Sequence, residues 1–326
     1  MTTAVDTTHL APARSVGLWG AGHDGADALG QALAPLGYSL TPPGWSSQPD
    51  QPLVNLPLVV GLGPSDATWA SRLEHLGHVA SYQEATLFDF QALDPAIAAL
   101  WGSLDDGVMG GVSASQVQWQ NGLRFVGQVS TANSGGFASI RTRNLEPPLN
   151  LSQWQGTVLY AQGDGQRYKW ILRDNPDWDS LAYCYSFDTD SDRPITVRTP
   201  FLDPVATRRA RTVPEASALN PAQVYSMQLM LSKFEYDGDL NPSFEPGSFE
   251  LTVQRLAVYR QGPKPVLVLP QGNAALGPQL AAAGLTGVVP QGQGAQGPGF
   301  EVIGANQTLP PEVSPAAVET ILQQLM

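Results

Sequence analysis

Cysteine and lysine are scarce in this chain of 326 residues, and each scarcity excludes some chemistry. Cys184 is the only cysteine, which excludes an intramolecular disulfide and any zinc site built from cysteines. A single free thiol fits a reducing compartment, and we expect a cytoplasmic protein. Lys169, Lys233 and Lys264 are the only lysines. Most positive charge is therefore arginine, which favours directed, bidentate contacts over diffuse attraction.

Long apolar runs are also missing. No stretch approaches the ~18 consecutive apolar residues of a membrane-spanning helix, and we expect the chain to be soluble. Residues 1–13 are rich in threonine, contain no Lys or Arg and lack a continuous apolar segment. We predict a flexible tail here rather than a secretory signal.

Positive charge and histidine are both in short supply. The chain has 17 Lys and Arg against 29 Asp and Glu, a formal net charge of -12, which repels nucleic acid and anionic lipid. All four histidines precede residue 80: His9, His23, His75 and His78. The rest of the chain thus lacks the commonest general base near neutral pH. The i, i+3 pair His75 and His78 is interpreted as a solvated helix face rather than a metal site.

The two ends of the chain have an α/β pattern. In residues 14–82, a short apolar strand at 15–19 precedes a glycine-rich turn and a helix at 26–36. Further elements are predicted in both ends: strands at 38–40, 56–61, 266–269, 286–289 and 300–303, and helices at 67–76, 274–283 and from Ser314. Each flank alone is only about 60–70 residues, near the limit for a self-sufficient core. We therefore predict that residues 14–82 and 264–326 pool their strands in one sheet.

Residues 87–262 have a different pattern, with short alternating runs separated by Gly, Asn, Asp and Pro, which is typical of an all-β sandwich or barrel. Strands are predicted at 123–129, 137–141, 157–161, 167–173, 181–187, 195–198, 225–231 and 249–259. Tyr168, Trp170 and Leu172 alternate on one face of their strand, as do Phe249, Leu251 and Val253 in theirs. Such alternation indicates a sheet packed on one side.

Several motifs of this middle region occur in a recognisable order. They are the segments Trp101 to Ser113 (WGSLDDGVMGGVS), Phe125 to Gly127, Asn133 to Arg141 (NSGGFASIR), Gly163 to Tyr168 and the pair Pro200-Phe201. This series resembles the complex I intermediate-associated protein 30 family from Leu87 to Tyr259. It departs from the family at Ile195-Thr196-Val197, where a tryptophan often precedes the Pro-Phe pair.

The resemblance implies a jelly-roll sandwich with a galactose-binding-like fold, similar to carbohydrate-binding modules. It also implies a chaperone-like role in assembling a membrane-bound electron-transfer complex, respiratory or photosynthetic, whose subunits are the partners. Contact with the energy-converting membrane would then be peripheral and only through those partners.

The flanks resemble an atypical short-chain dehydrogenase with the sandwich inserted. Gly20, Gly22 and Gly25 match the dinucleotide-binding fingerprint between a strand and a helix. However, Tyr38 to Gly44 contains no acidic residue to hold the ribose ~20 positions on. The residues four before the three lysines are Gly165, Leu229 and Arg260, so the family's catalytic Tyr–Lys pair is missing. We expect an α+β chain of two domains, a central sandwich in a reduced Rossmann-like domain, with no cofactor (NAD(P) being the alternative) and no enzymatic activity.

A group of residues in the motifs is the predicted partner-binding surface, with Met and Phe as apolar anchors and Arg as a directed charge. Its members are Asp105, Asp106, Met109, Gly110, Gly111, Ser113, Asn133, Gly136, Phe137 and Arg141. The alternative for the adjacent Asp105 and Asp106 is a structural turn, because neighbouring side chains on an extended strand point apart.

Other functions remain open as alternatives. A nucleotide-sensing regulator would use Gly20, Gly22 and Gly25. A carbohydrate-binding module would use a platform of aromatic residues: Trp119, Trp154, Trp170 and Trp178. The acidic runs 188–192 and 237–241 place carboxylates at alternate positions as calcium loops do, but neither continues into an EF-hand pattern, and both are interpreted as acidic loops.

Overall fold

The computed structural model describes residues 10, 14–19, 34, 38–41, 52–56, 58–61, 69–92, 94–268, 276–294 and 297–304. The chain divides into two compact units, Met1–Ala11 with Ala85–Arg260, and Pro12–Glu84 with Gln261–Met326. Of the predicted helix at 26–36 only residue 34 is among the described residues, and the predicted helix from Ser314 lies outside them. Within the described part of the chain, no helix has the length and hydropathy needed to cross a membrane.

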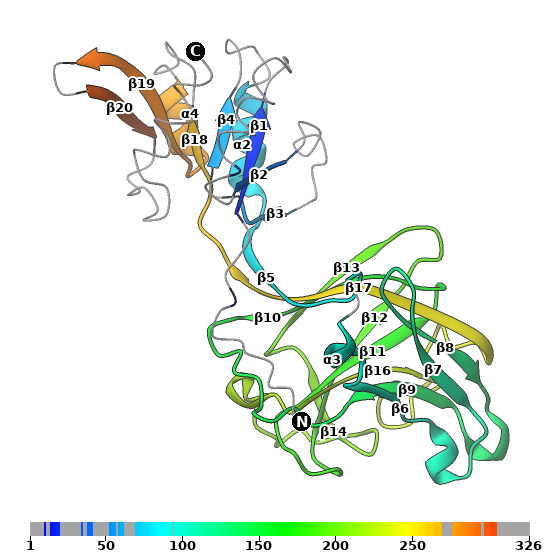
Figure 1. Cartoon of the computed structure of the whole chain (residues 1–326). Coiled ribbons are helices and arrows are strands. Elements are labelled where there is room, and N and C mark those ends of the chain that lie inside the picture. Colours follow the sequence, from blue (N-terminus) through cyan, green and yellow to red (C-terminus); the bar gives the residue numbers. More distant parts are fainter. Residues whose placement is uncertain are drawn as a thin grey trace. The chain divides into compact units, whose positions relative to one another are not determined.

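The second unit contains one sheet whose strands come from both flanks of the sequence (Figure 1). Its strands are β1 (Arg14–Trp19), β2 (Tyr38–Thr41), β4 (Leu58–Gly61), β18 (Val266–Val268), β19 (Thr286–Gly294) and β20 (Gly297–Gly304), in the order β2-β1-β4-β18-β19-β20. Strand β18 pairs in parallel with β4, with Val266 opposite Leu58. All pairs are parallel except the final β19–β20 pair. Parallel strands need cover on both faces, which explains their continuous apolar runs.

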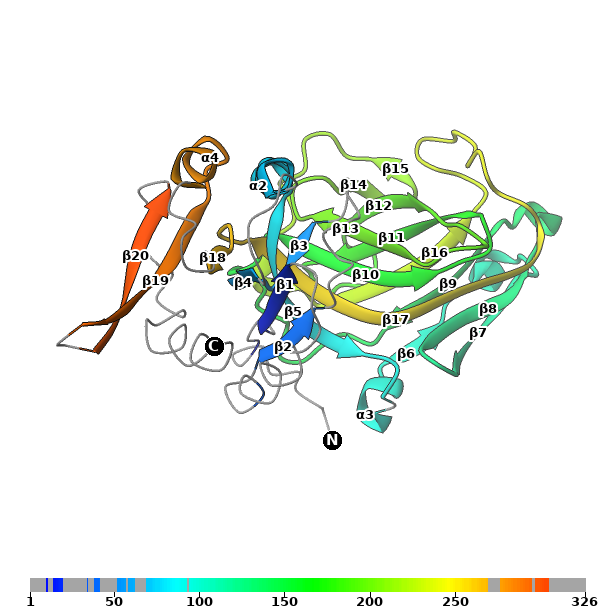
Figure 2. The same cartoon turned by 90° about the horizontal axis from the view of Figure 1, so that it is seen from above.

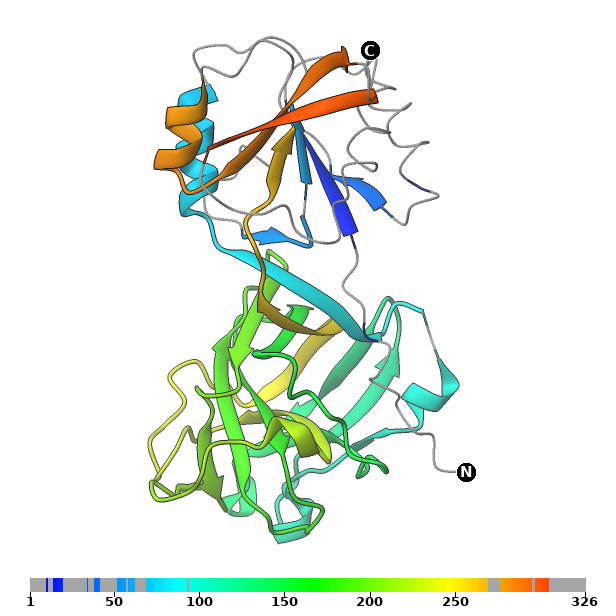
Figure 3. The same ribbon diagram turned by 90° about the vertical axis from the view of Figure 1, so that its left-hand side faces the viewer.

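Two helices of this unit, α2 (Trp69–His78) and α4 (Gly277–Ala282), lie side by side (Figure 3). Leu73 and Leu76 of α2 pack with Leu280 of α4 in one core cluster that also includes Val59 and Leu267 of the sheet. Both helices were predicted, although α4 is shorter than the predicted 274–283. Pro278 lies in the first turn of α4, where a missing N–H is tolerated. Short strand β3 (Leu53–Val54) pairs with residues 81–82 of β5 (Ser81–Asp89).

Lys264 joins the two flanks within this unit. Its ammonium donates hydrogen bonds to the carbonyls of Leu76 (3.2 Å) and Val79 at the end of α2. Burial lowers the pKa of Lys264. The last carbonyls of a helix have no partner within the helix, so we expect Lys264→Met to weaken α2 by about 1–2 kcal/mol. Amide hydrogen exchange should quicken about tenfold in residues 69–78 and stay unchanged in Lys233→Met, since Lys233 donates no such bond. Equal exchange in both variants would contradict this role.

The first unit is a sandwich of two antiparallel sheets. One sheet has the order β13 (Ile195–Pro200), β10 (Gly156–Gln162), β17 (Gly247–Gln261) and β5, and the hairpin of β7 (Ala114–Trp119) and β8 (Leu123–Val129) joins it at β17. The long strand β17 pairs with β10 along one part and with β8 along another (Figure 2). The other sheet has the order β15 (Arg211–Thr212), β14 (Val205–Arg208), β12 (Ala182–Asp188), β11 (Arg167–Arg173), β16 (Ser226–Ser232), β9 (Phe137–Thr142) and β6 (Trp101–Ser103). Helices are few here: the α-helix α3 (Pro95–Ala98) and the 3-10 turns η3 (Asp106–Met109), η4 (Ala132–Ser134) and η5 (Pro221–Gln223).

The core lies between the two sheets. The predicted inward faces, Tyr168, Trp170 and Leu172 in β11 and Phe249, Leu251 and Val253 in β17, are all buried in one cluster, which confirms both predictions. The indole N–H of Trp170 donates to the hydroxyl of Thr157 in the opposite sheet, at 2.9 Å. This bond satisfies two buried polar groups and connects the layers.

The outer face of β11 is also covered at one end, which the alternating pattern did not predict. Ile171 packs with Ala182 and Cys184 beneath Tyr236, and the ammonium of Lys169 donates to the carbonyls of Phe234, at 2.7 Å, and Glu235. The segment that follows β16 folds back over this end of the sheet, because Lys169 can satisfy its carbonyls there. The other end of the outer face is not covered by this segment and forms a pocket.

Candidate binding pocket on the outer face of the sandwich

Two arginines lie close together on the outer face. Arg141 of β9 is opposite Gln228 of β16, and Arg173 of β11 is opposite Ser226 of β16. In both strands the neighbouring residues, Ile140 and Leu172, point into the core. Side chains alternate along a strand, so both guanidinium groups are on the outer face with only β16 between their strands.

Arg141 is buried and has no partner of opposite charge. Only 7% of the residue is exposed, and within the described part of the chain its guanidinium makes no hydrogen bond or ion pair. Its nearest aromatic contact is Trp178, whose ring centroid lies 5.1 Å from Cζ. Burial and, second to it, the positive charge of Arg173 lower the pKa of Arg141 to about 10. A buried charge is ordinarily paired, so this arginine is an exception that needs a reason.

Arg173 is only partly satisfied. Its Nη2 donates to Oε1 of Gln228 at 3.4 Å, while its buried Nε and Nη1 have no partner among the described residues. Burial lowers the pKa of Arg173 as well. The amide of Gln228 donates to the hydroxyl of Ser139 at 3.0 Å, which fixes the amide with its oxygen toward Arg173.

Arg141 opens into a pocket of about 410 Å³. Its lining consists of β6, the end of β9 and the loop before β12: Leu100, Trp101, Gly102, Ser103, Leu104, Arg141, Thr142, Arg143, Asn144, Pro176 and Trp178. Trp101 borders the pocket from the core side, because its indole packs in the core edge to face with Phe90. The side-chain amide of Asn144 donates to the carbonyl of Pro176 at 2.7 Å and holds the loop in place. The described lining thus has the unpartnered guanidinium of Arg141 and no carboxylate.

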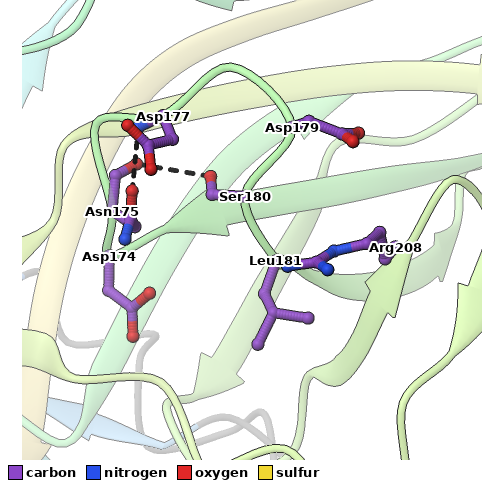
Figure 4. A pocket seen from close by; sticks show the side chains of 7 residues that line it. All are labelled: Asp174, Asn175, Asp177, Asp179, Ser180, Leu181 and Arg208. Atoms are coloured by element: carbon purple, nitrogen blue, oxygen red, sulfur yellow. Dashed lines mark hydrogen bonds between the residues drawn. The ribbon is translucent and has the colours of Figure 1, made fainter.

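The same loop borders a second hollow of about 380 Å³ on its other side (Figure 4). Asn175 holds the loop, accepting from the backbone N–H of Asp177 at 2.8 Å and from the hydroxyl of Ser180 at 3.3 Å. The hollow is lined by Asp174, Asp177, Asp179, Arg208 and these loop residues. Asp179 is paired with Arg209. In the described part of the chain, no three His, Cys, Asp or Glu side chains are grouped closely enough to hold a metal ion.

The predicted residues Asp105 and Asp106 hold the turn at η3, each with different partners. The buried carboxylate of Asp106 accepts from the hydroxyl of Ser113 (2.7 Å) and from the backbone N–H groups of Ser113 (2.9 Å), Gly136 (2.7 Å) and Phe137 (3.3 Å). Burial raises the pKa of Asp106, but these bonds outweigh burial and lower the pKa below its ordinary 3.8. Asp105 accepts from Ser115 and from the N–H of Ser139.

The glycines of this motif make room for Asp106. A Cβ on Gly111 would lie 2.3 Å from Cγ of Asp106, and Gly136 has a φ of 143°, which L side chains rarely adopt. Met109 (73% exposed) and Val112 (53%) project from the turn. Gly110 ends the turn with a φ of 89°, and Asn133 lies exposed in η4 with a φ of 53°.

The structure therefore separates the predicted surface residues into two places. Asp106 joins the segment 106–113 to Gly136 and Phe137, whereas Arg141 lines the pocket with Trp178. Sequence reasoning missed Arg173 and Gln228. The outward position of Arg173 was predictable from the alternation of Tyr168, Trp170 and Leu172, but the proximity of both residues to Arg141 depends on strand order.

Other predicted candidates are placed as follows. Gly20, Gly22 and Gly25 lie outside the described residues, and His78 is exposed. Of the aromatic residues, Trp170 is in the core and Trp178 is 68% exposed. In the acidic loops, Asp188 pairs with Arg167 and Asp190 with Arg193, while Asp237 accepts from Thr212.

Together, fold and pocket define a β-sandwich protein with a donor-lined recess on the outer face of one sheet. The family model of complex I intermediate-associated protein 30 (CIA30) matches residues 88–253. The chain belongs to this family, as the motifs predicted. No curated protein matches the chain.

Solved structures similar to the chain include three carbohydrate-active proteins. A family 11 carbohydrate-binding module of Clostridium thermocellum is 17% identical, with 54% of this chain and 93% of that chain covered and a TM-score of 0.39. An endo-1,3-beta-glucanase catalytic domain of Thermotoga petrophila is 10% identical, with 57% and 100% covered and a TM-score of 0.32. A lichenase from a mouse hindgut metagenome is 11% identical, with 54% and 98% covered and a TM-score of 0.30.

Proposed function

We propose that this protein is a non-catalytic binding protein that assists the assembly of a membrane-bound electron-transfer complex, either respiratory complex I or a photosystem. The observation that carries the proposal is the family match, which spans the sandwich from residue 88 to 253. Membership of the CIA30 family suggests a role associated with complex I assembly. The protein would act in the cytoplasm and reach the energy-converting membrane through its partners.

The turn at η3 supports a binding role by its construction. Met109 and Val112 are exposed apolar side chains on a segment that Asp106 holds with four hydrogen bonds. A preordered segment loses little conformational entropy on binding, and methionine adapts to varied apolar surfaces. The proposed mechanism is transient capture of an unassembled subunit, which leaves when its proper neighbour arrives, without a covalent step.

Replacing both anchors tests this mechanism. In Met109→Ser with Val112→Ser, we expect capture of the complex subunits from native membranes to fall at least about tenfold, because apolar contact area is lost. The melting temperature should stay within about 1 °C, since both side chains are exposed. The readout is quantitative mass spectrometry of subunits that co-purify with the tagged chain.

Two exposed leucines provide the matched control. Leu202 is 83% and Leu240 is 72% exposed, and Leu202→Ser with Leu240→Ser removes comparable apolar surface outside the segment 106–113. Full capture is expected in this variant. Equal capture by both double variants, or no complex subunit in the wild-type sample, would remove the proposal.

A nucleotide-sensing role is the second candidate, and the strand order of the second unit favours it. In the order β2-β1-β4, strand β2 is added on one side of β1 and the later strand β4 on the other side. Open α/β sheets bind ligands beyond the carboxyl ends of strands at such a switch point. Gly20, Gly22 and Gly25 follow β1 in sequence. Titration with NADH and NADPH separates the candidates: a rise in melting temperature of several degrees at millimolar dinucleotide supports nucleotide binding, and its absence supports the cofactor-free proposal.

A further inference from the structure

The pocket beside Arg141 has a consistent chemical character. Among its described lining residues, Arg141 and Arg143 are the charged groups, and the buried guanidinium of Arg141 makes no hydrogen bond or ion pair with the described residues. Arg173 lies outside the lining, with strand β16 between its strand and that of Arg141, and its positive charge lowers the pKa of Arg141. Asp179 acts as an opposite charge on Arg173, whereas no carboxylate lines the pocket at Arg141.

We propose that this pocket binds a carboxylate, with Arg141 as the group that contacts the anion and Arg173 as the charge that supports it. The planar fork of a guanidinium matches the two oxygens of a carboxylate. Bound in the pocket, the anion accepts from the guanidinium of Arg141, which has no partner among the described residues, and offsets the repulsion between Arg141 and Arg173. Carboxylate binding by the purified protein does not depend on the proposed assembly role.

Charge favours a carboxylate over a phosphate in this place. The loop that forms one wall also carries Asp174, Asp177 and Asp179, which line the neighbouring hollow, and the whole chain has a formal charge of -12. A second negative charge doubles the repulsion from these carboxylates as well as the attraction to the guanidinium groups, whereas the one unpartnered guanidinium, that of Arg141, is already matched by the two oxygens of a carboxylate. A monoanion can thus use the guanidinium at a smaller electrostatic penalty.

The aromatic wall indicates what the carboxylate is attached to. Trp178 is 68% exposed and lies over Arg141, with its ring centroid 5.1 Å from Cζ, and the amide of Asn144 holds its loop through Pro176. A volume of about 410 Å³ exceeds the needs of a single carboxylate. The ligand is therefore a carboxylate joined to a flat or apolar group that packs against the indole.

Benzoate is the probe, and benzamide is its neutral counterpart of the same shape. With ionic strength held constant by sodium chloride, we expect the melting temperature of the whole chain to rise by about 3 °C at benzoate tenfold above its Kd. Acetate should act more weakly because it lacks the ring, and benzamide should have no effect. Isothermal titration with benzoate gives the Kd directly.

Three variants locate the response. Arg141→Gln should abolish the benzoate shift, and Arg141→Lys should weaken binding about tenfold, because it keeps the charge and loses the fork. Arg193→Gln removes one guanidinium from an exposed loop, where Arg193 pairs with Asp190, and should leave the shift intact. Since Arg141→Lys preserves the buried charge, its titration remains informative even if Arg141→Gln folds poorly.

Several results would overturn the proposal. They are no shift with any carboxylate, an equal shift with benzamide, an undiminished shift in Arg141→Gln and Arg141→Lys, or a phosphate response as large as that of benzoate. Binding of cellotriose that Arg141→Gln abolishes, without a carboxylate response, would assign the pocket to a neutral sugar instead. Failure of the subunit capture experiment leaves these outcomes unaffected, so the two proposals fail separately.

Discussion

Removing the carboxylate of Asp106 is expected to destabilise the sandwich by about 3–5 kcal/mol in Asp106→Ala at pH 7. The reason is that the hydroxyl of Ser113 and three backbone N–H groups lose their common acceptor at a site with no exposed surface on Asp106. Hydrogen bonds to a charged group contribute about 1.5–3 kcal/mol each, and an unsatisfied buried donor adds to the loss. Urea unfolding of both proteins measures the difference.

The pH dependence of the unfolding free energy is a second, independent test of the role of Asp106. Because the pKa of Asp106 is lowered from 3.8 in the folded chain, its stabilisation is complete above that ordinary value and is lost as the pH falls through the lowered pKa. The difference in unfolding free energy between wild type and Asp106→Asn should thus shrink below about pH 4. Asp188→Ala, which breaks an ion pair with the exposed carboxylate of Asp188, should change stability by less than about 1 kcal/mol. A constant difference down to pH 2 would contradict the assignment.

The strands that could be predicted best are those with one clean apolar face. Both ends of β8 (Leu123–Val129) and β11 (Arg167–Arg173) agree with the prediction, because alternation and flanking turn residues define such strands locally. Strand β7 (Ala114–Trp119) was missed. Its residues are exposed or half-buried on both faces, and its apolar face consists of only Val117 and Trp119, which pack against the core. This short stripe is weak evidence for a strand, and pairing with β8 defines it.

The pocket was less predictable because it depends on strand order. Arg141 was selected from a motif, and its outward direction follows from Ala138 and Ile140, which are buried in the core. Nothing local places it beside Arg173, which is 32 residues further along the chain (173 − 141). Only the order β11-β16-β9 brings the two together. The arrangement of Asp105 and Asp106, in contrast, was predictable from local sequence. A structural turn was the alternative given for them, and their adjacent carboxylates bind different partners, Ser115 and Ser113.

Trp170 should be the side chain on which the sandwich depends most. Only 1% of it is exposed, and Trp170→Ala should lower the unfolding free energy by about 3–5 kcal/mol through the cavity it leaves.

Trp170→Phe separates packing from the hydrogen bond, because a phenyl ring keeps apolar contacts but leaves the hydroxyl of Thr157 without the indole donor at 2.9 Å. Thr157→Val removes the other partner. In a double-mutant cycle measured by urea unfolding, the two single changes should be coupled by about 1 kcal/mol, so that the double variant is more stable than their sum predicts. Strict additivity would mean that the two sheets are held by apolar packing alone and that this bond contributes nothing to their union.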